Sequence, residues 1–488
     1  MQERRRIQIS KKKKDITLEV IGGNATGVTG SCTKIEFFGR TILFELGMIQ
    51  DNNTILGNYR DNCDIFNRMK PKNIEMVIVG HCHCDHIGLI PMLFARGNSD
   101  AKIIVPKGSF CILKEMWLDC AYICERDCEV LNHKGNKSHT PLYTQNEVET
   151  ALKNVVEIEI GKIIDLDENI AIRYTPAGHI LKSCQTELFI NSSSHTKKIY
   201  FSSDLGNRQI ENRKVFVEKF HPITSANISI VESTYGKRNS SATKKGIELD
   251  RQKMKSVIQE FCMERNRRVL IPTFSLDRMP FILWELFQLF GHDESFRIPV
   301  LVDSPLANRL LDCYSSILID ESKKQFDQMM LWKNIQRIVS PEDSKAAILD
   351  KGAKIICSSS GMLTAGRSVK WVQSVLPNEN DCILFVGYAG MDTLAGHIKH
   401  GNGQKTITIN GKPYKNKATL VDLTSYSSHM QHNDLVQYYK SLNCEKIYLV
   451  HGDKAARMEL KEDLEEALAA CCKSTRVVIV NKGTKISL

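Results

Sequence analysis

The 488-residue sequence lacks any apolar run close to the roughly 20 residues that a membrane-spanning helix needs. The best candidate, MPFILWELFQLF at residues 279–290, is too short and contains Glu285, which predicts a buried amphipathic helix instead. The basic residues at the start are followed by no apolar stretch, unlike a secretory signal. No membrane partner is therefore expected.

A disulfide framework is also absent. The 16 cysteines follow no regular spacing of the kind found in small secreted domains. Free thiols in a reducing compartment are expected, and with them a cytoplasmic location. Cys120, Cys124 and Cys128 recur every four residues, which places them on one stripe of a helix. Because this spacing is no recognised zinc or iron–sulfur pattern, it predicts a packed, half-buried stripe.

The main body of the chain has little excess charge. The net charge is +10, and residues 1–14 hold seven Lys/Arg and one Glu, which leaves +4 (10 − 6) for the rest. Residues 1–14 are expected to form a basic arm that either meets a polyanion or is simply solvated. The sequence has no low-complexity linker and no repeat of fixed period. Its length and ordinary apolar content predict two or three globular domains.

Strand-like and helix-like segments alternate along the chain. IEMVIVG at residues 74–80 is almost continuously apolar, as expected for a strand covered on both faces. Residues 108–155 read as helical, with a polar interruption at residues 132–141. Further on, helical segments alternate with apolar strands such as RVLIPTF at residues 268–274, which is typical of a parallel-sheet α/β unit.

Four apolar strands are followed by polar segments with catalytic side-chain types. These segments are HCHCDH at residues 81–86, DLGN at 204–207, ESTYG at 232–236 and HGD at 451–453. Sites in open α/β sheets form beyond the carboxyl ends of strands. The recurrence therefore predicts one shared site.

The first segment has the spacing of metal ligands. Alternate residues of an extended loop point the same way, so His81 and His83 could face one metal ion. Asp85 and His86 follow as the loop turns into a helix and could reach a second ion. Imidazole and carboxylate ligands suit zinc, and also manganese or iron.

The cysteines in the gaps of this segment are not expected to bind metal. Cys82 and Cys84 should point away from the histidines on an extended loop. Two thiolates added to three imidazoles would also exceed tetrahedral zinc. Small buried side chains behind the loop are the expected arrangement.

Further ligands for two metal ions are available after other strands. His179 lies in PAGHILKS, Asp204 in FSSDLG and His451 in VHGD. Each of these residues alone would more often be structural. Their common position after an apolar strand favours a shared metal site.

The motifs, in this order, resemble those of the metallo-β-lactamase superfamily and specifically its β-CASP branch of nucleases. GHCHCDHIGLIP is similar to the HxHxDH signature, and PAGHILKS and FSSDLG to the third and fourth ligand motifs. VESTYGKR, SYSSHMQHNDL and VHGD resemble the three β-CASP motifs. The resemblance covers nearly the whole chain and implies an α/β fold, an αββα sandwich with an inserted α/β domain of mainly parallel sheet. The implied parts are 15–209 and 423–488 for the metallo-β-lactamase domain and 210–422 for the β-CASP domain.

The resemblance implies two Zn²⁺ ions, with Mn²⁺ as an alternative. The implied ligands are His81, His83 and His179 for one ion, Asp85, His86 and His451 for the other, and Asp204 between them. Asp85, Glu232 and His429 are implied to be catalytic, with His429 protonating the leaving 3′-oxygen and Glu232 orienting it. Glu45 stands where the family usually has aspartate and is implied to support a metal-ligating histidine.

The resemblance also bears on the substrate. CSSSGMLTAGR at residues 357–367 offers the hydroxyls of Ser358, Ser359 and Ser360 and the charge of Arg367 to phosphate. Lys182 adds a cation near the site or is merely solvated.

RNA is the substrate that the resemblance favours. RNA-processing members carry histidine in the last motif, as at His451, whereas DNA-repair members usually have valine. Single-stranded RNA, bound in a cleft between the domains, is therefore expected, cut endonucleolytically to 5′-phosphate and 3′-hydroxyl ends. A DNA nuclease, another metallo-hydrolase and, least favoured, an inactive scaffold are the alternatives. The sequence leaves open 5′-exonuclease action, a homodimer and any protein partner.

Overall fold

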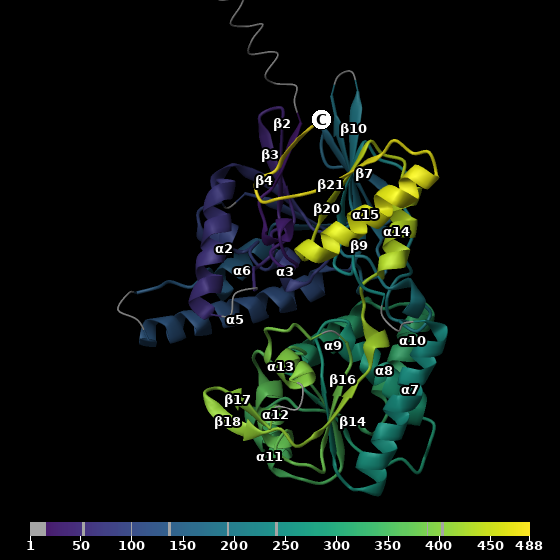
Figure 1. The fold of residues 1–488 in the computed structure, drawn as a ribbon. Helices are drawn as coiled ribbons and strands as arrows, with labels where there is room; N and C mark the ends of the chain where they lie inside the picture. The colour runs from purple at the N-terminus through teal and green to yellow at the C-terminus, as the bar shows by residue number, and fades with distance from the viewer. Residues whose placement is uncertain are drawn as a thin grey trace, which may run out of the picture. The chain divides into compact units, whose positions relative to one another are not determined.

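The structure, a computed structural model, divides into two compact units (Figure 1). Unit 1 comprises Met1–Arg208, Glu218–Asn239 and His429–Leu488, and unit 2 comprises Gln209–Val217 and Ser240–Ser428. The residues described are 16–50, 54–98, 100–134, 138–192, 195–239, 243–387, 389–401 and 405–488, so the basic arm expected at residues 1–14 lies outside them. In these ranges no helix is long and apolar enough to cross a membrane.

Unit 1 contains two seven-stranded sheets. The first has the strand order β22 (Lys485–Ser487), β1 (Thr17–Val20), β2 (Thr33–Phe37), β3 (Arg40–Phe44), β4 (Ile74–Ile78), β5 (Lys102–Pro106), β6 (Val155–Ile158). The second has the order β21 (Arg476–Ile479), β20 (Lys446–Val450), β11 (Ile228–Glu232), β10 (Thr196–Phe201), β9 (Cys184–Asn191), β8 (Ile170–Pro176), β7 (Ile163–Asp165).

The two sheets enclose the main core of unit 1, which contains buried side chains from both. Phe44, the last residue of β3, stacks on Phe201, the last residue of β10, with ring centroids 4.1 Å apart. Burying an aromatic ring of this size contributes about 1.5–3 kcal/mol. The stack also fixes the positions of the residues that follow each ring, Glu45 and Ser202.

Helices cover the outer faces of the sandwich. A second core joins β10, β11 and β20 to helices α14 (His432–Ser441) and α15 (Lys454–Ala470), which lie side by side against β20 and β21 (Figure 1). The other helices of unit 1 lie on the side of the first sheet: α2 (Ile55–Met69), α3 (Cys84–Ile87), α4 (Met92–Ala95), α5 (Phe110–Lys134) and α6 (Gln145–Leu152).

Unit 2 is built on a six-stranded sheet in which every pairing is parallel. Its order is β14 (Ile335–Arg337), β13 (Val300–Asp303), β15 (Lys354–Ser358), β12 (Arg268–Pro272), β16 (Cys382–Phe385), β19 (Thr419–Asp422). A hairpin of β17 (Thr406–Ile409) and β18 (Lys412–Lys415) is separate. The helices are α7 (Lys244–Ile258), α8 (Arg278–Phe290), α9 (Pro305–Ile317), α10 (Asp320–Met330), α11 (Pro341–Leu349), α12 (Arg367–Val375) and α13 (Leu394–His400).

The predicted fold class, an αββα sandwich with an additional parallel-sheet α/β domain, is confirmed. The apolar segment at residues 279–290 is helix α8, and the helical region with a polar interruption is α5 followed by α6. The boundaries differ from a single insertion over residues 210–422. Residues 218–239 belong to unit 1, because β11 pairs in parallel with both β10 and β20.

Candidate metal centre

The polar segments of unit 1 meet at one edge of the sandwich. His179, Asp204 and His451 follow the carboxyl ends of β8, β10 and β20, and Glu232 ends β11. Strand β8 pairs antiparallel with β9, and β9 pairs antiparallel with β10, so β8 and β10 run the same way as β11 and β20. The segment at residues 81–86 comes from the other sheet, after β4.

Backbone hydrogen bonds hold the HCHCDH segment against the chain that follows β3 and against Ser31, which precedes β2. The Leu46 amide donates to the His86 carbonyl at 3.0 Å, and the Ser31 amide donates to the Asp85 carbonyl at 2.7 Å. Between them, Gly47 passes so close that a Cβ there would lie 1.6 Å from the Asp85 carbonyl oxygen. Only glycine allows this approach, which places Glu45 next to the segment.

The other loops of the site are joined in the same way. The Gly206 amide donates to the Ala177 carbonyl at 2.8 Å, which ties the Asp204 loop to the His179 loop. Gly206 also forms a β-bridge with His429. A Cβ on Gly206 would lie 2.0 Å from the Gly178 carbonyl oxygen, so these loops too depend on glycine.

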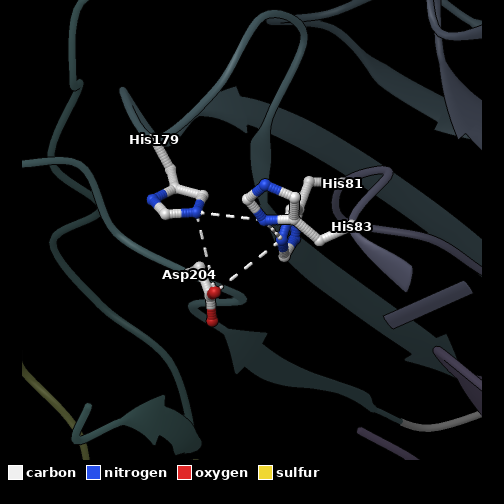
Figure 2. Close-up of side chains that lie close together, drawn as sticks. All are labelled: His81, His83, His179 and Asp204. Carbon is white, nitrogen blue, oxygen red and sulfur yellow. Dashed lines mark hydrogen bonds and ion pairs between the residues drawn. The ribbon is translucent and has the colours of Figure 1, made fainter. Parts of the chain in front are cut away.

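Three imidazoles and one carboxylate form the first group (Figure 2). The Nδ1 atom of His83 lies 3.1 Å from Nε2 of His81 and 3.3 Å from Nε2 of His179. Both of these Nε2 atoms lie 3.7 Å from Oδ2 of Asp204. Figure 2 shows the three rings turned toward one another beside Asp204.

A second group, Asp85, His86 and His451, lies on the other oxygen of Asp204. Nε2 of His86 and Nε2 of His451 are 3.6 and 3.5 Å from Oδ2 of Asp85. Oδ1 of Asp204 is 3.5 Å from Nε2 of His86 and 3.3 Å from Nδ1 of His451. Asp204 therefore presents one oxygen to each group.

The residues present fit metal ions. Tetrahedral zinc with bonds of about 2.0–2.1 Å to nitrogen places its ligand nitrogens about 3.3 Å apart, close to the spacing of the first group. Within the described residues, Nε2 of His86, Nε2 of His451 and Oδ1 of Asp204 are buried without a hydrogen-bond partner. Buried polar atoms normally have partners. A metal ion would supply one here.

Glu45 supports two of these histidines. Nδ1–H of His86 donates to Oε2 of Glu45 at 2.6 Å, and the Ser203 hydroxyl donates to Oε1 of Glu45 at 2.6 Å. Because the Ser203 proton is used in this way, its oxygen accepts from Nδ1–H of His81 at 2.9 Å. Both histidines therefore have the tautomer that leaves Nε2 free for a metal ion. Sequence reasoning missed Ser203, although it directly precedes Asp204.

Thr234 plays a similar part for His451 and was also missed. Its hydroxyl oxygen lies 3.0 Å from Nδ1 and 3.3 Å from the backbone oxygen of His451. Because the Thr234 hydroxyl donates its proton to the His451 carbonyl, its oxygen can accept from Nδ1–H of His451. Nε2 of His451 is then available to a metal ion. Thr234 lies two residues after Glu232 in the ESTYG segment, and this position in a strand-end motif could have identified it from the sequence.

The proton affinities of the two groups differ. Burial holds the pKa of His81, His83 and His179 below the ordinary value. Burial acts in the same direction on His451, but Asp204 and Asp85 raise its pKa to about 9. Although burial opposes it, His451 and His86, when they are protonated in the metal-free protein, hold the pKa of Asp204 well below its usual range.

Glu232 and His429 lie beside the first group, but they are not hydrogen-bonded to each other. Nδ1 of His429 is 3.8 Å from Oε1 of Glu232. The oxygens of Glu232 instead accept from the amides of Leu205 at 2.6 Å and Thr234 at 3.1 Å. The ring of His429 has its centroid 4.6 Å from that of His179.

Neither cysteine of the segment belongs to a candidate metal group of the described chain. Cys82 is buried, and burial raises the pKa of its thiol to about 12. Cys84 is partly exposed, and its sulfur contacts Cys120. Cys120, Cys124 and Cys128 are buried rather than half-buried, at 4%, 8% and 4% exposure.

The cationic candidates for substrate binding are already paired. Nζ of Lys182 lies 2.7 Å from Glu218. In unit 2, Arg367 donates to buried Asp303 at 2.7 Å and to the carbonyls of Ile338 and Val339.

The serine candidates also have intramolecular partners. Ser358 donates to the Asp303 carbonyl at 2.8 Å. The hydroxyls of Ser359 and Ser360 contact those of Ser275 and Thr364, at 2.7 and 3.2 Å. These groups therefore stabilise unit 2 whether or not they also meet phosphate.

Two domain families match the chain. The Beta-Casp domain matches residues 280–398, and the Zn-dependent metallo-hydrolase RNA specificity domain matches residues 413–476. The second match ends after His451.

Curated relatives are similar over most of the chain. Ribonuclease TTHA0252 of Thermus thermophilus is 26% identical over 444 residues, which are 90% of this chain and 94% of that protein. Transcription termination factor FttA of Methanocaldococcus jannaschii is 26% identical over 80% of this chain, which spans 60% of that longer protein. Integrator complex subunit 11 of Danio rerio is 23% identical over 96% of this chain and 75% of its own length.

The fold is also similar to a solved structure. A crystal structure of a protein of unknown function from Enterococcus faecalis covers 97% of this chain with a TM-score of 0.55 and 12% identity, a likeness in fold alone. The domain matches, the relatives and the order of the motifs agree. The Beta-Casp domain, the Zn-dependent metallo-hydrolase RNA specificity domain and the ribonuclease relatives support the predicted resemblance of this chain to the RNA-processing nucleases of the β-CASP branch of the metallo-β-lactamase superfamily.

Proposed function

We propose that the chain is a two-zinc ribonuclease that hydrolyses phosphodiester bonds of single-stranded RNA to 5′-phosphate and 3′-hydroxyl ends. The observation that carries the proposal is the pair of ligand groups on the two oxygens of Asp204. Imidazole-rich groups of this spacing favour zinc, and manganese is the alternative.

When bound, two zinc ions supply a water of lowered pKa and positive charge for the phosphate oxygens. The chain supplies the negative charges of Asp85 and Asp204, two against the four positive charges of two ions. The two ions and their direct ligands together therefore keep a positive charge for a phosphodiester anion. The burial of Asp204 and of four of the five ligand histidines, His81, His86, His179 and His451, excludes water from the ligand set.

His429 is the proposed general acid for the leaving 3′-oxygen. Its side chain is 24% exposed and lies against His179, so it is within reach of both solvent and the metal centre. Glu232 is proposed to act on it through charge rather than through a direct hydrogen bond, while it holds the Asp204 loop by its two backbone contacts.

The first test replaces the proposed acid. His429→Ala should retain the bound metal but lose turnover by about 10²–10⁴-fold, the usual contribution of general acid–base catalysis. Metal content and single-turnover cleavage are measured side by side. His133→Ala, which changes an exposed histidine at the end of α5, is the matched control. Full activity in His429→Ala would refute the role of this residue.

The second test compares substrates. Single-stranded RNA and DNA of the same sequence are offered to the zinc-loaded protein, and RNA is expected to be cut faster. Cutting of a circular single-stranded RNA shows endonucleolytic action, since a circle has no 5′ end. Ligation and phosphatase treatment of the products identify the 5′-phosphate. A preference for DNA would overturn the RNA proposal.

A cytoplasmic location is also proposed, on the cysteine pattern alone.

A further inference from the structure

Two cysteine features that the proposed function does not use meet in unit 1. Cys84 is the first residue of α3, inside the metal-binding segment, and Cys120 lies in the middle of α5. Their sulfur atoms are 3.2 Å apart. We infer that Cys84 and Cys120 are a redox pair, an oxidative modification site at which a hydroperoxide converts two thiols into a disulfide.

The surrounding contacts keep the two thiols together. Helices α3 and α5 contact each other (Figure 1). Nε1–H of Trp117 on α5 donates to the Ile87 carbonyl at 3.0 Å, and the Tyr143 hydroxyl donates to the Gly88 carbonyl at 2.6 Å. Both bonds end on the backbone directly after the metal-binding segment: the Trp117 bond fixes α5 against it, and the Tyr143 bond fixes the chain that precedes α6.

The pocket around Cys84 is shaped for a sulfur atom. A Cβ on Gly88 would lie 2.8 Å from its Sγ, so glycine at this position leaves the thiol its space. Sδ of Met48 lies on another side at 4.0 Å. Cys84 is partly exposed whereas Cys120 is buried, so an oxidant in solvent reaches Cys84 first.

The reaction balances with one hydroperoxide. The Cys84 sulfur attacks the terminal oxygen of hydrogen peroxide, which breaks the O–O bond, releases one water and leaves a sulfenic acid. The Cys120 sulfur then attacks the Cys84 sulfur, and the sulfenic hydroxyl leaves with the Cys120 proton as a second water. The two thiols together lose two electrons and two protons, and one hydrogen peroxide accepts them and becomes two waters.

The bond would pull on the metal-binding segment. A disulfide needs its sulfurs about 2.05 Å apart, so they must approach by about 1 Å. Cys84 lies between His83 and Asp85, one from each ligand group, and the approach displaces both. This consequence rests on the proposed metal site, whereas formation of the disulfide does not. Oxidation is therefore expected to weaken metal retention until a thiol reductant restores the dithiol.

Neighbouring cysteines provide matched controls. Cys124 and Cys128 lie one and two turns further along the same helix and are equally buried. The Cys128 thiol donates to the His139 carbonyl at 3.0 Å. Cys124→Ser and Cys128→Ser should therefore leave the oxidation unchanged, while Cys120→Ser and the more conservative Cys120→Ala should abolish it.

The test treats the reduced, zinc-loaded protein with a small excess of hydrogen peroxide and then with an alkylating agent. Peptide mass spectrometry should find the Cys84 and Cys120 peptides linked, about 2 Da lighter than the sum of the two thiol peptides, and separated again by dithiothreitol. Recovery of both peptides alkylated, or of Cys84 as sulfinic acid without a link, would overturn the pairing.

Metal retention is read from the same samples. Zinc transfer to a chelator should be on the order of tenfold faster after oxidation, in wild type and in Cys124→Ser but not in Cys120→Ser. A linked pair with unchanged zinc transfer would overturn the coupling to the metal site alone. A linked pair in a protein that binds no zinc would leave the redox pair standing while refuting the proposed function.

Discussion

At the scale of single residues, the hydrogen bond made by Nδ1 of His86 and of His81 determines whether Nε2 of the same ring is available to a metal ion. Glu45 fixes His86 directly and His81 through Ser203, and its own backbone has a φ of 60°. Glu45, which is longer than the aspartate expected from the family resemblance, therefore contacts His86 directly and reaches His81 through the Ser203 hydroxyl.

Replacing Glu45 tests this arrangement. In Glu45→Gln the amide group must face either the Ser203 hydroxyl or the His86 N–H, so one donor loses its acceptor. We expect zinc affinity to fall by about 10–100-fold, as for other second-sphere partners of metal ligands. Competition with a chromophoric chelator measures it. Ser203→Ala should have a smaller effect because it spares His86.

The control for this experiment is Glu36→Gln, on β2 and half-exposed. It should bind zinc as the wild type does. Equal affinity in Glu45→Gln and the wild type would show that the carboxylate does not orient the ligands.

At the scale of elements, the end of β13 and the start of α12 are joined by a buried carboxylate. Asp303 accepts from Arg367, from Nε1–H of Trp371 at 2.7 Å and from the Ser344 hydroxyl at 2.6 Å. This network explains the serine- and arginine-containing segment at residues 357–367 as part of the framework of unit 2.

Removal of the arginine should therefore destabilise unit 2. Arg367→Ala leaves the carboxylate of Asp303 buried without its cation, which costs about 3–5 kcal/mol. Urea unfolding measures the loss. The double variant Asp303→Asn/Arg367→Ala should recover part of it, because the stranded charge is gone. A stable Arg367→Ala protein with weaker RNA binding would instead support the phosphate role expected from the sequence.

At the scale of the whole molecule, the metal centre couples stability to pH. After a chelator has removed metal, the carboxylates of Asp204 and Asp85 overcome the effect of burial and raise the pKa of His451 from 6.5 to about 9. A histidine whose pKa is higher in the folded state stabilises that state fully when the pH is below its pKa in the unfolded state. This stabilisation is lost as the pH rises through its pKa in the folded state. The metal-free protein should therefore lose stability between about pH 6.5 and pH 9.

Thermal unfolding of the chelated protein at intervals across this range measures the slope. His451→Asn, which keeps a polar side chain but cannot titrate, should reduce it, and His86, whose pKa is also raised by neighbouring carboxylates although burial lowers it, keeps the remainder. Zinc should also reduce the slope, since a coordinated histidine must already have lost its proton. A melting temperature that rises over this pH range in the chelated wild type would contradict the assignment.

The sequence by itself determined the fold class, the helix at residues 279–290 and the list of metal-ligand candidates. Hydrophobic periodicity marks the elements, strand-end motifs name the side chains that reach a sheet edge, and the order of the motifs gives the family resemblance that implies the αββα fold. Only the tertiary structure decided which atoms of these side chains face one another. It brought Ser203 and Thr234 to the histidines, kept His429 3.8 Å from Glu232, paired Arg367 with Asp303 and set Cys84 against Cys120. Periodicity records which face of an element is buried, whereas such contacts join residues as far as 217 positions apart and depend on packing between elements.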